Sequence, residues 1–582
     1  MKEIPSFFKK PDPITDIADT KEYDIVVIGA GSPGVPCALK AAELGAKVAI
    51  LQKEKEAAAC GNFGAGILTD KSDPVDVEKC VSMLEAASGH RAKRELLDMW
   101  AKKSGEAVLW TIEKGKEAGA QVVDMGTNAH AGLLKRTGWH IEFTTCVFKP
   151  KPYDTGAAMK AMCKLAEKKG VDIFYETPAV MLDQGADGRV TGVIGEHEGK
   201  HILFKARKGV VVATGDYAND KSMMDYYLPD MTNFALKRTG RSGDGHKMIV
   251  WAGGRMENVG HTKMAHDMDS GPTSLMSAPY LRVKLNGRRF CDETVGMELM
   301  NCYLTFAEDS GHYCQIFDSR YVDQAKKIGT TVDDPESLKN WMPEEDSEHK
   351  GVMKDLIDTY KADTLEELAK KLRIKDIPAF LETVKHYNEM AKAGKDTEMG
   401  VPAEKLCPVE VGPFYGVHRH IRFTVGCSGV VINEKMQCLD KDDNPIPGLY
   451  AAGNLAGNFY GSIDYPLDIF GLNSVLLVDL VGVHEVLPHD ISGRSNRGDR
   501  VQKRLGHPHG EHRILLSQRL PARCGITVTA SQHPSHSELN HADHHRNEPQ
   551  CNFGPGFSIL QVDDKSGRAA NDKNQRHQPH IK

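Results

Sequence analysis

An apolar run without polar alternation marks the first structural unit that the sequence predicts. Residues 25–28 read Ile-Val-Val-Ile, which predicts a buried parallel strand, because a half-exposed strand would alternate apolar and polar side chains. A helical pattern follows over residues 36–44, and a second apolar run covers residues 47–51. This order and spacing predict a strand–helix–strand unit of an α/β fold.

Three glycines stand between the first predicted strand and the helix. Gly29, Gly31 and Gly34 have the spacing G-x-G-x-x-G. In such a turn the first glycine permits a sharp bend, the second lets the backbone approach a pyrophosphate, and the third lets helix pack close to strand. The helix N-terminus adds unpaired N–H groups and a partial positive charge. The sequence therefore predicts a dinucleotide site here.

The end of the second predicted strand departs from the usual dinucleotide pattern. An acidic residue is expected there, because it accepts hydrogen bonds from a ribose diol. The chain has Gln52 instead, followed by Lys53 and Glu54. An amide oxygen can also accept from a hydroxyl, with a weaker contact, so we predict that Gln52 and Lys53 contact the cofactor. Glu54 is interpreted as a surface residue.

Several later segments fit one large ligand site. Residues 209–215 and 446–453 are apolar runs that end in glycine, and residues 60–66 form a glycine-rich loop. Residues 189–194 and 201–206 alternate around a polar turn, which predicts antiparallel strands. Each segment alone is typical of an ordinary turn, but together and in this order they are not generic.

Composition restricts the possible function classes. The 582 residues suggest two or three domains, and the net charge of −6 gives no basic surplus for nucleic acid. No apolar run approaches the roughly 20 residues that span a bilayer, and the first residues lack a secretion signal. The 13 cysteines contain no C-x-x-C pair, which argues against an iron–sulfur or zinc site. We expect a cytoplasmic protein without a metal centre.

The motifs in this order resemble the flavoprotein family of fumarate reductase and succinate dehydrogenase, in particular its 3-ketosteroid dehydrogenase branch. The resemblance covers roughly residues 22–474 and rests on Val27–Gly34, Gly61-Asn62, Val212–Gly215, Gly243–Gly245, Met256-Glu257 and Pro447–Gly453. It implies FAD as the cofactor. It also implies a Rossmann-like FAD-binding domain with an inserted α+β capping domain.

The resemblance further implies how the chain is divided. An N-terminal arm covers residues 1–21, and the FAD-binding domain covers 22–254 and 406–482. The capping domain lies between them, at 255–405. It is expected to be rich in helices, and residues 363–372 predict an N-capped amphipathic helix.

The same resemblance implies a set of FAD contacts. The three glycines would hold the pyrophosphate, Gln52 the adenosine ribose and the Val180 backbone the adenine, while Asp244 and Asn454 would meet the ribityl chain. Asn454 is a second departure, because that position is usually acidic. The complete set of expected cofactor residues is Gly29, Gly31, Gly34, Gln52, Lys53, Gly61, Asn62, Gly66, Val180, Ala213, Gly215, Asp244, Gly453, Asn454, Asn473 and Ser474.

The cations that clamp a dicarboxylate in fumarate-type relatives are missing. Met297 stands where the resemblance expects the proton-donating arginine, and Phe423 where it expects a histidine. A further expected arginine is absent from residues 464–473. Only His261 lies near an expected position, one residue out of register, and a purely structural role for it is equally open. Without cations two buried carboxylates would be very costly, so we expect a small-molecule substrate that contains a carbonyl and is larger and more apolar than fumarate.

A tyrosine is a candidate for contacting the substrate in place of the missing cations. Tyr465 falls where 3-ketosteroid dehydrogenases, by resemblance, carry a tyrosine that hydrogen-bonds the substrate ketone; a core or lid tyrosine is the alternative. Tyr460 is a second candidate, and Tyr280 and Tyr303 are candidate proton donors. We expect hydride transfer between flavin N5 and a carbonyl-conjugated C=C bond, in a steroid- or bile-acid-like 3-oxo compound or another enoate or enone. The electron donor or acceptor is unknown, and a flavin-binding electron-transfer protein without its own turnover is the alternative class.

The chain changes character near its end. From about residue 483 it is rich in histidine and arginine and shows no periodic apolar pattern. A disordered tail, a metal-binding tract around His541, His544 and His545, and a frameshift near residue 474 all fit this change. The DNA sequence distinguishes the last of these, because an alternative frame should restore a flavoprotein C-terminus.

Overall fold

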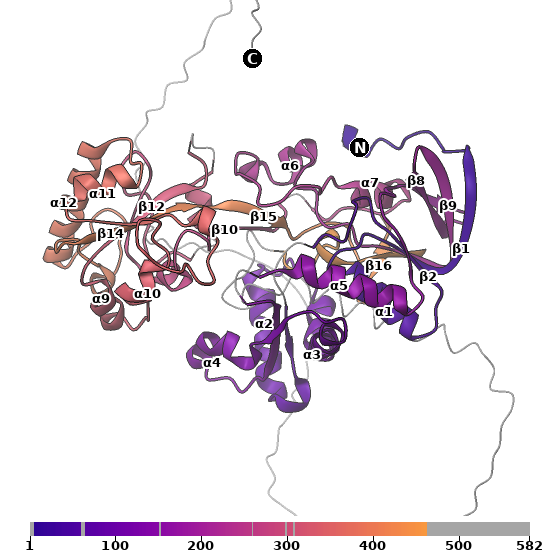
Figure 1. The fold of residues 1–582 in the computed structure, drawn as a ribbon, viewed down its shortest axis with the longest axis horizontal. Coiled ribbons are helices and arrows are strands. Elements are labelled where there is room, and N and C mark those ends of the chain that lie inside the picture. Colours follow the sequence, from indigo (N-terminus) through magenta and orange to yellow (C-terminus); the bar gives the residue numbers. More distant parts are fainter. Residues whose placement is uncertain are drawn as a thin grey trace, which may run out of the picture. The chain divides into compact units, whose positions relative to one another are not determined.

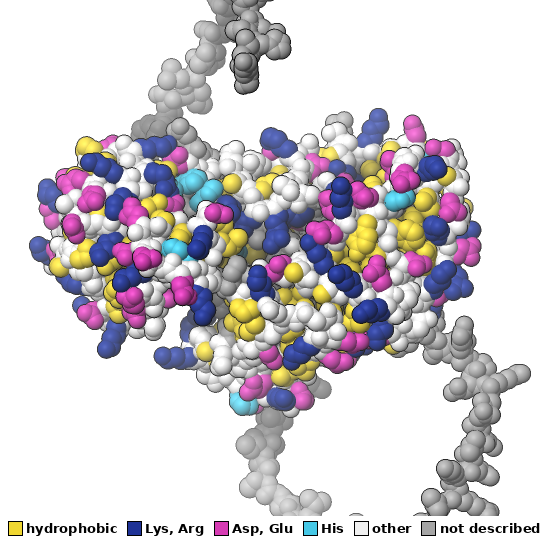
Figure 2. All heavy atoms as spheres, viewed as in Figure 1, with side chains coloured by type: hydrophobic (Ala, Val, Ile, Leu, Met, Phe, Trp, Pro, Cys, Tyr) yellow, Lys and Arg dark blue, Asp and Glu magenta, His cyan; other side chains and the backbone are white. Residues whose placement is uncertain are grey.

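The computed structural model describes residues 5–59, 64–150, 153–258, 260–296, 300–305 and 309–461. All of them belong to one compact unit, Met1–Arg497. Within these residues no helix is long and apolar enough to cross a membrane. Basic and acidic side chains are interspersed over the face shown in Figure 2.

A mainly parallel sheet forms the centre of the first part of the chain (Figure 1). Among the described residues it has eight strands: β1 (Ile17–Ile28), β2 (Val48–Leu51), β6 (Asp172–Phe174), β7 (Ala179–Gln184), β8 (Val190–His197), β9 (Lys200–Val212), β16 (Gln437–Leu439) and β17 (Pro445–Ala451). Six follow the order β16-β17-β9-β1-β2-β6, in which β17, β9, β1, β2 and β6 pair in parallel. This confirms the predicted α/β class.

The predicted strand–helix–strand unit is present. Helix α1 (Gly34–Glu43) connects β1 to β2, whose residues pair in parallel from Ile25 opposite Val48 to Ile28 opposite Leu51. Val26 and Val27 are completely buried, which explains why the run lacks polar alternation. The sheet fixes the carboxyl ends of β1, β2 and β9 side by side, and ligands of such folds bind at this edge.

One strand is longer than the sequence suggested. Residues 201–206 and 209–212, which the pattern divides, lie in the single strand β9. Its first half pairs antiparallel with β8 and its second half pairs in parallel with β17, while β1 runs along its whole length. A register shift near Tyr23 and Ile25 interrupts the pairing of β1 with β9 between these two halves.

Further helices and a small sheet complete the first part of the fold. The helices are α2 (Pro74–Ala87), α3 (Arg94–Glu117), α4 (Ala131–Thr137), α5 (Thr155–Lys168), α6 (Lys221–Tyr227) and α7 (Asp244–Trp251). The small sheet has the order β3 (Ala65–Ile67), β5 (Phe143–Phe148), β4 (Val122–Asp124), and it packs on α3. Carboxylates of Asp73, Asp154 and Asp220 cap helices α2, α5 and α6.

A two-stranded ribbon leads into and out of the inserted segment (Figure 1). It pairs β10 (Lys263–His266) with β15 (Arg422–Gly426). Between them lies the antiparallel sheet β11 (Leu281–Val283), β12 (His312–Asp318), β14 (Phe414–His420), β13 (Thr359–Ala362), with helices α9 (Tyr321–Lys327), α10 (Pro335–Lys339), α11 (Leu365–Lys371) and α12 (Ile377–Ala393). Strand β14 carries this sheet past residue 405, where the sequence placed the end of the capping domain.

The helix predicted over residues 363–372 is α11. Its first residues are fixed by Thr364, whose hydroxyl accepts a hydrogen bond from the backbone N–H of Glu367. Leu368 and Leu372 are buried in the core of the inserted segment, as the amphipathic pattern requires.

The N-terminal arm is anchored on two helices. Phe8 is 7% exposed, and its carbonyl accepts a hydrogen bond of 3.1 Å from the indole N–H of Trp251 at the end of α7. The ring of Phe7 lies 5.8 Å from that of Tyr226 and 6.2 Å from that of Tyr227, both in α6. The arm thus adds apolar contacts beside the sheet.

Candidate functional site

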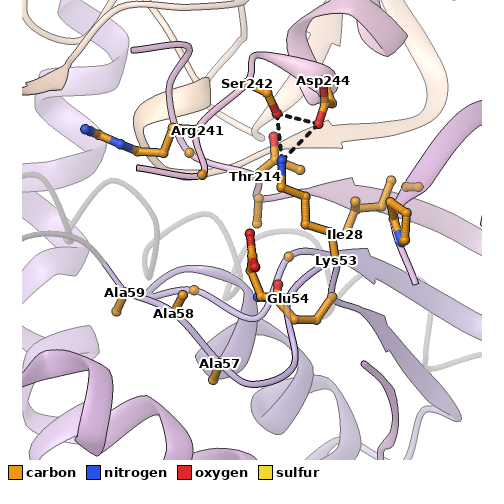
Figure 3. Close-up of a pocket in the computed structure, with 18 of the residues that line it drawn as sticks. Ile28, Lys53, Glu54, Ala57, Ala58, Ala59, Thr214, Arg241, Ser242 and Asp244 are labelled. Atoms are coloured by element: carbon orange, nitrogen blue, oxygen red, sulfur yellow. Dashed lines mark hydrogen bonds and ion pairs between the residues drawn. The ribbon is translucent and has the colours of Figure 1, made fainter. Parts of the chain in front are cut away.

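A cavity of about 710 Å³ lies at the carboxyl ends of β1, β2 and β9 (Figure 3). Its walls come from segments that are far apart in the sequence. They are the glycine turn after β1, residues 51–59 after β2, residues 213–215 after β9, the loop 238–244 and Asn454. The sheet order brings the segments after β1, β2 and β9 to one edge, and the loop 238–244 before α7 completes the cavity there.

The glycine turn leaves no space for side chains. Gly29 has φ +106°, and a Cβ there would lie 2.6 Å from the carbonyl oxygen of Ala213. A Cβ on Gly34 would lie 1.9 Å from the carbonyl oxygen of Gly29. Gly31 lines the cavity itself. The first and third glycines are therefore required for packing, and the second exposes backbone to the cavity.

The amide of Gln52 is occupied within the protein. Its oxygen accepts a hydrogen bond of 3.0 Å from the backbone N–H of Ala30, and its nitrogen donates one of 3.0 Å to the carbonyl of Glu56. Gln52 is 7% exposed. Its two hydrogen bonds link the glycine turn to the segment after β2.

A polar cluster stands on the opposite wall. The ammonium group of Lys53 donates to the hydroxyl of Ser242 at 2.7 Å and lies 3.3 Å from the carboxylate of Asp244 (Figure 3). Asp244 is the first residue of α7, and the preceding Gly243 has φ +70°, a conformation that favours glycine. This geometry aims the N-terminus of α7 and its unpaired N–H groups at the cavity.

Three oxygens around the cavity have no hydrogen-bond partner among the described residues. They are the hydroxyls of Ser32 and Thr214 and the side-chain carbonyl of Asn454, and all three are buried. Buried polar atoms without a partner are rare, because each costs about 1–3 kcal/mol. Donors and acceptors around a glycine-lined cavity fit a ligand that carries hydroxyls and phosphates.

Comparison with known proteins decides which ligand this is. The family model described as FAD binding domain matches residues 24–464. The chain belongs to this FAD-binding family. Its cofactor is FAD, as the sequence predicted.

Individual relatives agree with this family. The vinyl phenol reductase of Lactiplantibacillus plantarum is 26% identical over 492 residues, which are 76% of this chain and 93% of that protein. A probable fumarate reductase of Shewanella frigidimarina is 27% identical over 506 residues, covering 79% of this chain and 78% of that protein.

A solved structure has the same fold. The 3-ketosteroid Δ1-dehydrogenase from Sterolibacterium denitrificans, in complex with 1,4-androstadiene-3,17-dione, superposes with a TM-score of 0.60 at 17% identity, covering 80% of this chain and 99% of that protein. The predicted flavoprotein family with its inserted capping domain is confirmed.

The structure brings many of the expected FAD residues together. Those that line the cavity are Gly29, Gly31, Gln52, Lys53, Ala213, Gly215, Asp244 and Asn454. Gly61, Asn62, Asn473, Ser474 and Tyr465 lie outside the described residues.

Four expected residues lie outside the lining of the cavity. Gly34 has the packing role described above. Gly66 lies in β3, where a Cβ would come within 2.4 Å of the Ser104 backbone in α3, so it permits strand–helix contact. Val180 follows the lining residues Pro178 and Ala179, and Gly453 precedes Asn454.

The sequence reasoning named Gly243–Gly245 as a motif but assigned no cofactor role to residues 238–242 of the preceding loop. Its Arg238, Ser242 and neighbours line the cavity. The guanidinium of Arg241 instead points away from the cavity and pairs at 2.9 Å with the buried carboxylate of Asp216 (Figure 3). The alternation of glycines with polar residues just before Asp244 was a usable signal, but no spacing rule distinguishes it from a surface turn.

His261 lies in a buried aromatic cluster outside the cavity. Its Nδ1 is 2.5 Å from the hydroxyl of Tyr217, and its ring stacks on Tyr227 with centroids 4.2 Å apart. Its Nε2 faces the carbonyl of Glu257 at 3.4 Å. Burial lowers the pKa of His261 to about 4, so the imidazole is neutral at pH 7. Both nitrogens are engaged in this structure, and a catalytic role for His261 stays a prediction.

The other candidate substrate residues have different surroundings. Phe423 in β15 is completely buried in an apolar cluster that includes Tyr217 and Met231. Tyr460 is 6% exposed, and its ring meets Phe459 edge-on.

The two tyrosines named as candidate proton donors differ in exposure. The hydroxyl of Tyr280 donates to the carbonyl of Tyr321, and burial raises its pKa well above the usual value. Tyr303 is 44% exposed. Met297 lies outside the described residues.

Proposed function

We propose that this flavoprotein transfers hydride between FAD and the β-carbon of a carbonyl-conjugated C=C bond. FAD supplies the hydride chemistry when bound, through N5 of its isoalloxazine ring. The protein contributes the binding of the cofactor, the orientation of the substrate and the polarisation of its carbonyl. The names of the relatives support this reaction class, since fumarate and vinyl phenols both contain a C=C bond.

Phe423 is the observation that carries the substrate class. Its side chain lies in an apolar cluster, and the resemblance implies a histidine at this position in relatives that bind a dicarboxylate. A charged carboxylate packed against this cluster would lose its hydration, and the side chains of the cluster offer it no charged partner. A steroid- or bile-acid-like 3-oxo compound is the substrate class that we favour, and another enone or enoate is the alternative.

Tyr465 has the proposed role of hydrogen-bonding the substrate carbonyl. A phenol donates to the oxygen as negative charge develops there, and it requires no charge on the substrate. Reduction then adds hydride at the β-carbon and a proton at the α-carbon, and desaturation reverses both steps. The direction is set by the redox partner.

A Tyr465→Phe variant tests this role. It should retain FAD and lose about 10²-fold in kcat with a smaller change in KM, because the hydrogen bond strengthens as the reaction proceeds. Full turnover in this variant contradicts the assignment. Tight competition by succinate or fumarate contradicts the proposed apolar pocket.

A flavin-binding protein without turnover is the competing function. Gln52 and Asn454 in place of acidic residues favour it. It predicts a flavin that dithionite reduces and that no enone reoxidises.

A further inference from the structure

The side-chain amide of Gln52, the residue expected at the adenosine ribose, is already engaged within the protein at both its oxygen and its nitrogen. The amide oxygen of Gln52 accepts from the backbone N–H of Ala30, and its amide nitrogen donates to the carbonyl of Glu56. Gln52 is 7% exposed, so little of this amide is accessible to a ribose hydroxyl. Displacing the contact with the Ala30 N–H would also leave that donor unpaired.

Two residues further on, Glu54 has a carboxylate whose oxygens accept no hydrogen bond from the described residues. Glu54 lines the cavity and is exposed to it, and Figure 3 shows its carboxylate extending toward the loop that carries Ser242. Among the described residues this carboxylate has no hydrogen bond and no ion pair. Both of its oxygens are therefore available as acceptors.

Lys53 and Lys160 make contacts with other residues. Lys53 contacts Ser242 and Asp244, and Lys160 pairs with Glu56 at 2.5 Å. Neither neutralises Glu54. A carboxylate in the lining of a cavity that binds a dinucleotide favours hydroxyl donors over phosphates.

Gly240, in the loop across the cavity, leaves space next to the Glu54 carboxylate. Gly240 has φ +86°, and a Cβ there would lie 3.3 Å from Oε1 of Glu54. A side chain at this position would crowd the carboxylate and strain the backbone. A glycine at position 240 therefore preserves space next to the oxygen that would accept from a ligand.

From these contacts we infer that Glu54, and not Gln52, accepts hydrogen bonds from the adenosine ribose hydroxyls of FAD. Two carboxylate oxygens match the two donors of a vicinal diol. Gln52 has the separate role of bracing the glycine turn through Ala30. The inference concerns cofactor binding alone and is independent of the proposed substrate.

The roles of Glu54 and Gln52 can be distinguished by comparing the binding of FAD with the binding of FMN, which lacks the adenosine. The experiment titrates apoprotein, prepared by removing flavin from the purified full-length chain, with each flavin and follows flavin fluorescence. Glu54→Gln should raise the Kd for FAD about tenfold and leave the Kd for FMN within about twofold, because only FAD carries the adenosine ribose. Gln52→Leu should raise both values by similar factors, since it loosens the glycine turn that would hold the phosphate carried by both FAD and FMN.

Glu95→Gln is the matched control, because it removes the same charge from an exposed position in α3 outside the cavity. It should change neither Kd. Two results overturn the inference: a Glu54→Gln variant that binds FAD as tightly as the unmodified protein, or one that weakens FAD and FMN equally. A selective loss of FAD affinity in Gln52→Leu would return the ribose contact to Gln52.

Discussion

The hydroxyl of Tyr217 and Nδ1 of His261 lie 2.5 Å apart in a cluster that excludes solvent. Tyr217 comes two residues after Gly215 at the end of β9, and His261 comes just before β10. Their hydrogen bond therefore ties the cofactor sheet to the start of the ribbon that leads into the inserted segment. The properties of this contact follow from its burial.

Stability should fall in mild acid because of this cluster. Burial lowers the pKa of His261 to about 4, below the 6.5 of an exposed histidine. The unfolded chain then binds a proton more readily than the folded one, so the stabilisation is complete above pH 6.5 and is lost as the pH falls to about 4. A shift of this size corresponds to about 3 kcal/mol.

Urea unfolding at pH values between 4 and 7 measures this effect. His261→Gln should flatten the dependence of the unfolding free energy on pH, whereas His386→Gln, at an exposed position, should leave it unchanged. Burial also lowers the pKa of His130 to about 4 and of His246 to about 3, so part of the slope should persist. An identical slope in the His261→Gln variant would contradict this account of the cluster.

Gly34 should tolerate no side chain. Its added Cβ would lie 1.9 Å from the carbonyl oxygen of Gly29, which is backbone and cannot rotate away. Gly34→Ala should cost about 3 kcal/mol and release FAD, because the turn and α1 must separate. Thermal unfolding and the flavin content of the purified protein report the two effects.

Gly132→Ala is the control for that substitution. Gly132 lies in helix α4, and an added Cβ would meet nothing within 4 Å. The change should stabilise the protein by about 0.5–1 kcal/mol through helix propensity and the unfolded-state entropy. If both substitutions behave alike, the packing explanation for Gly34 is wrong.

The contributions of Asp216 and Arg241 to the unfolding free energy should depend on each other. Arg241 pairs at 2.9 Å with Asp216 and donates to the carbonyl of Thr424 at 2.7 Å, so it joins the cofactor loop to β15. Asp216→Ala removes the carboxylate from a buried guanidinium and should cost about 3–5 kcal/mol. The double variant Asp216→Ala/Arg241→Met should be less destabilised than the sum of the single variants, and chemical denaturation measures this coupling. Additive effects would show that the pair does not act as a unit.

The N-terminal arm should contribute to stability through Phe8. Its side chain is 7% exposed against α6 and α7. Phe8→Ala should lower the unfolding free energy by about 3 kcal/mol, measured by denaturation, while Ser6→Ala at an exposed position should have little effect. A Phe8→Ala variant with unchanged stability would mean that the arm is not docked in solution.

The glycine turn and its flanking elements could be predicted from sequence because they depend on local constraints. Gly29 and Gly34 are required by backbone geometry within a short segment, and the βαβ pattern around them is periodic. Arg241 and Glu54 could not be assigned in this way. Their roles depend on the loop 238–243 meeting the end of β2 across the sheet, and no local pattern encodes that meeting.

Gln52 shows most clearly which part of the site the sequence alone does not predict. The strand position predicted a ribose contact, and a carboxylate there would have no N–H to donate to Glu56. The amide has both an acceptor and a donor, and the fold uses both inside the protein. The sequence position was informative, but the hydrogen-bond partners required the structure.

The proposed reaction is hydride exchange between the bound flavin and the carbonyl-conjugated C=C bond of a substrate more apolar than fumarate. It is tested by reducing the flavin of the purified protein with dithionite under anaerobic conditions and following its absorbance after addition of a 3-oxo-steroid enone or fumarate. The enone should restore the oxidised flavin spectrum, and fumarate should do so much more slowly. A flavin that stays reduced with every enone, or that fumarate reoxidises fastest, would contradict it.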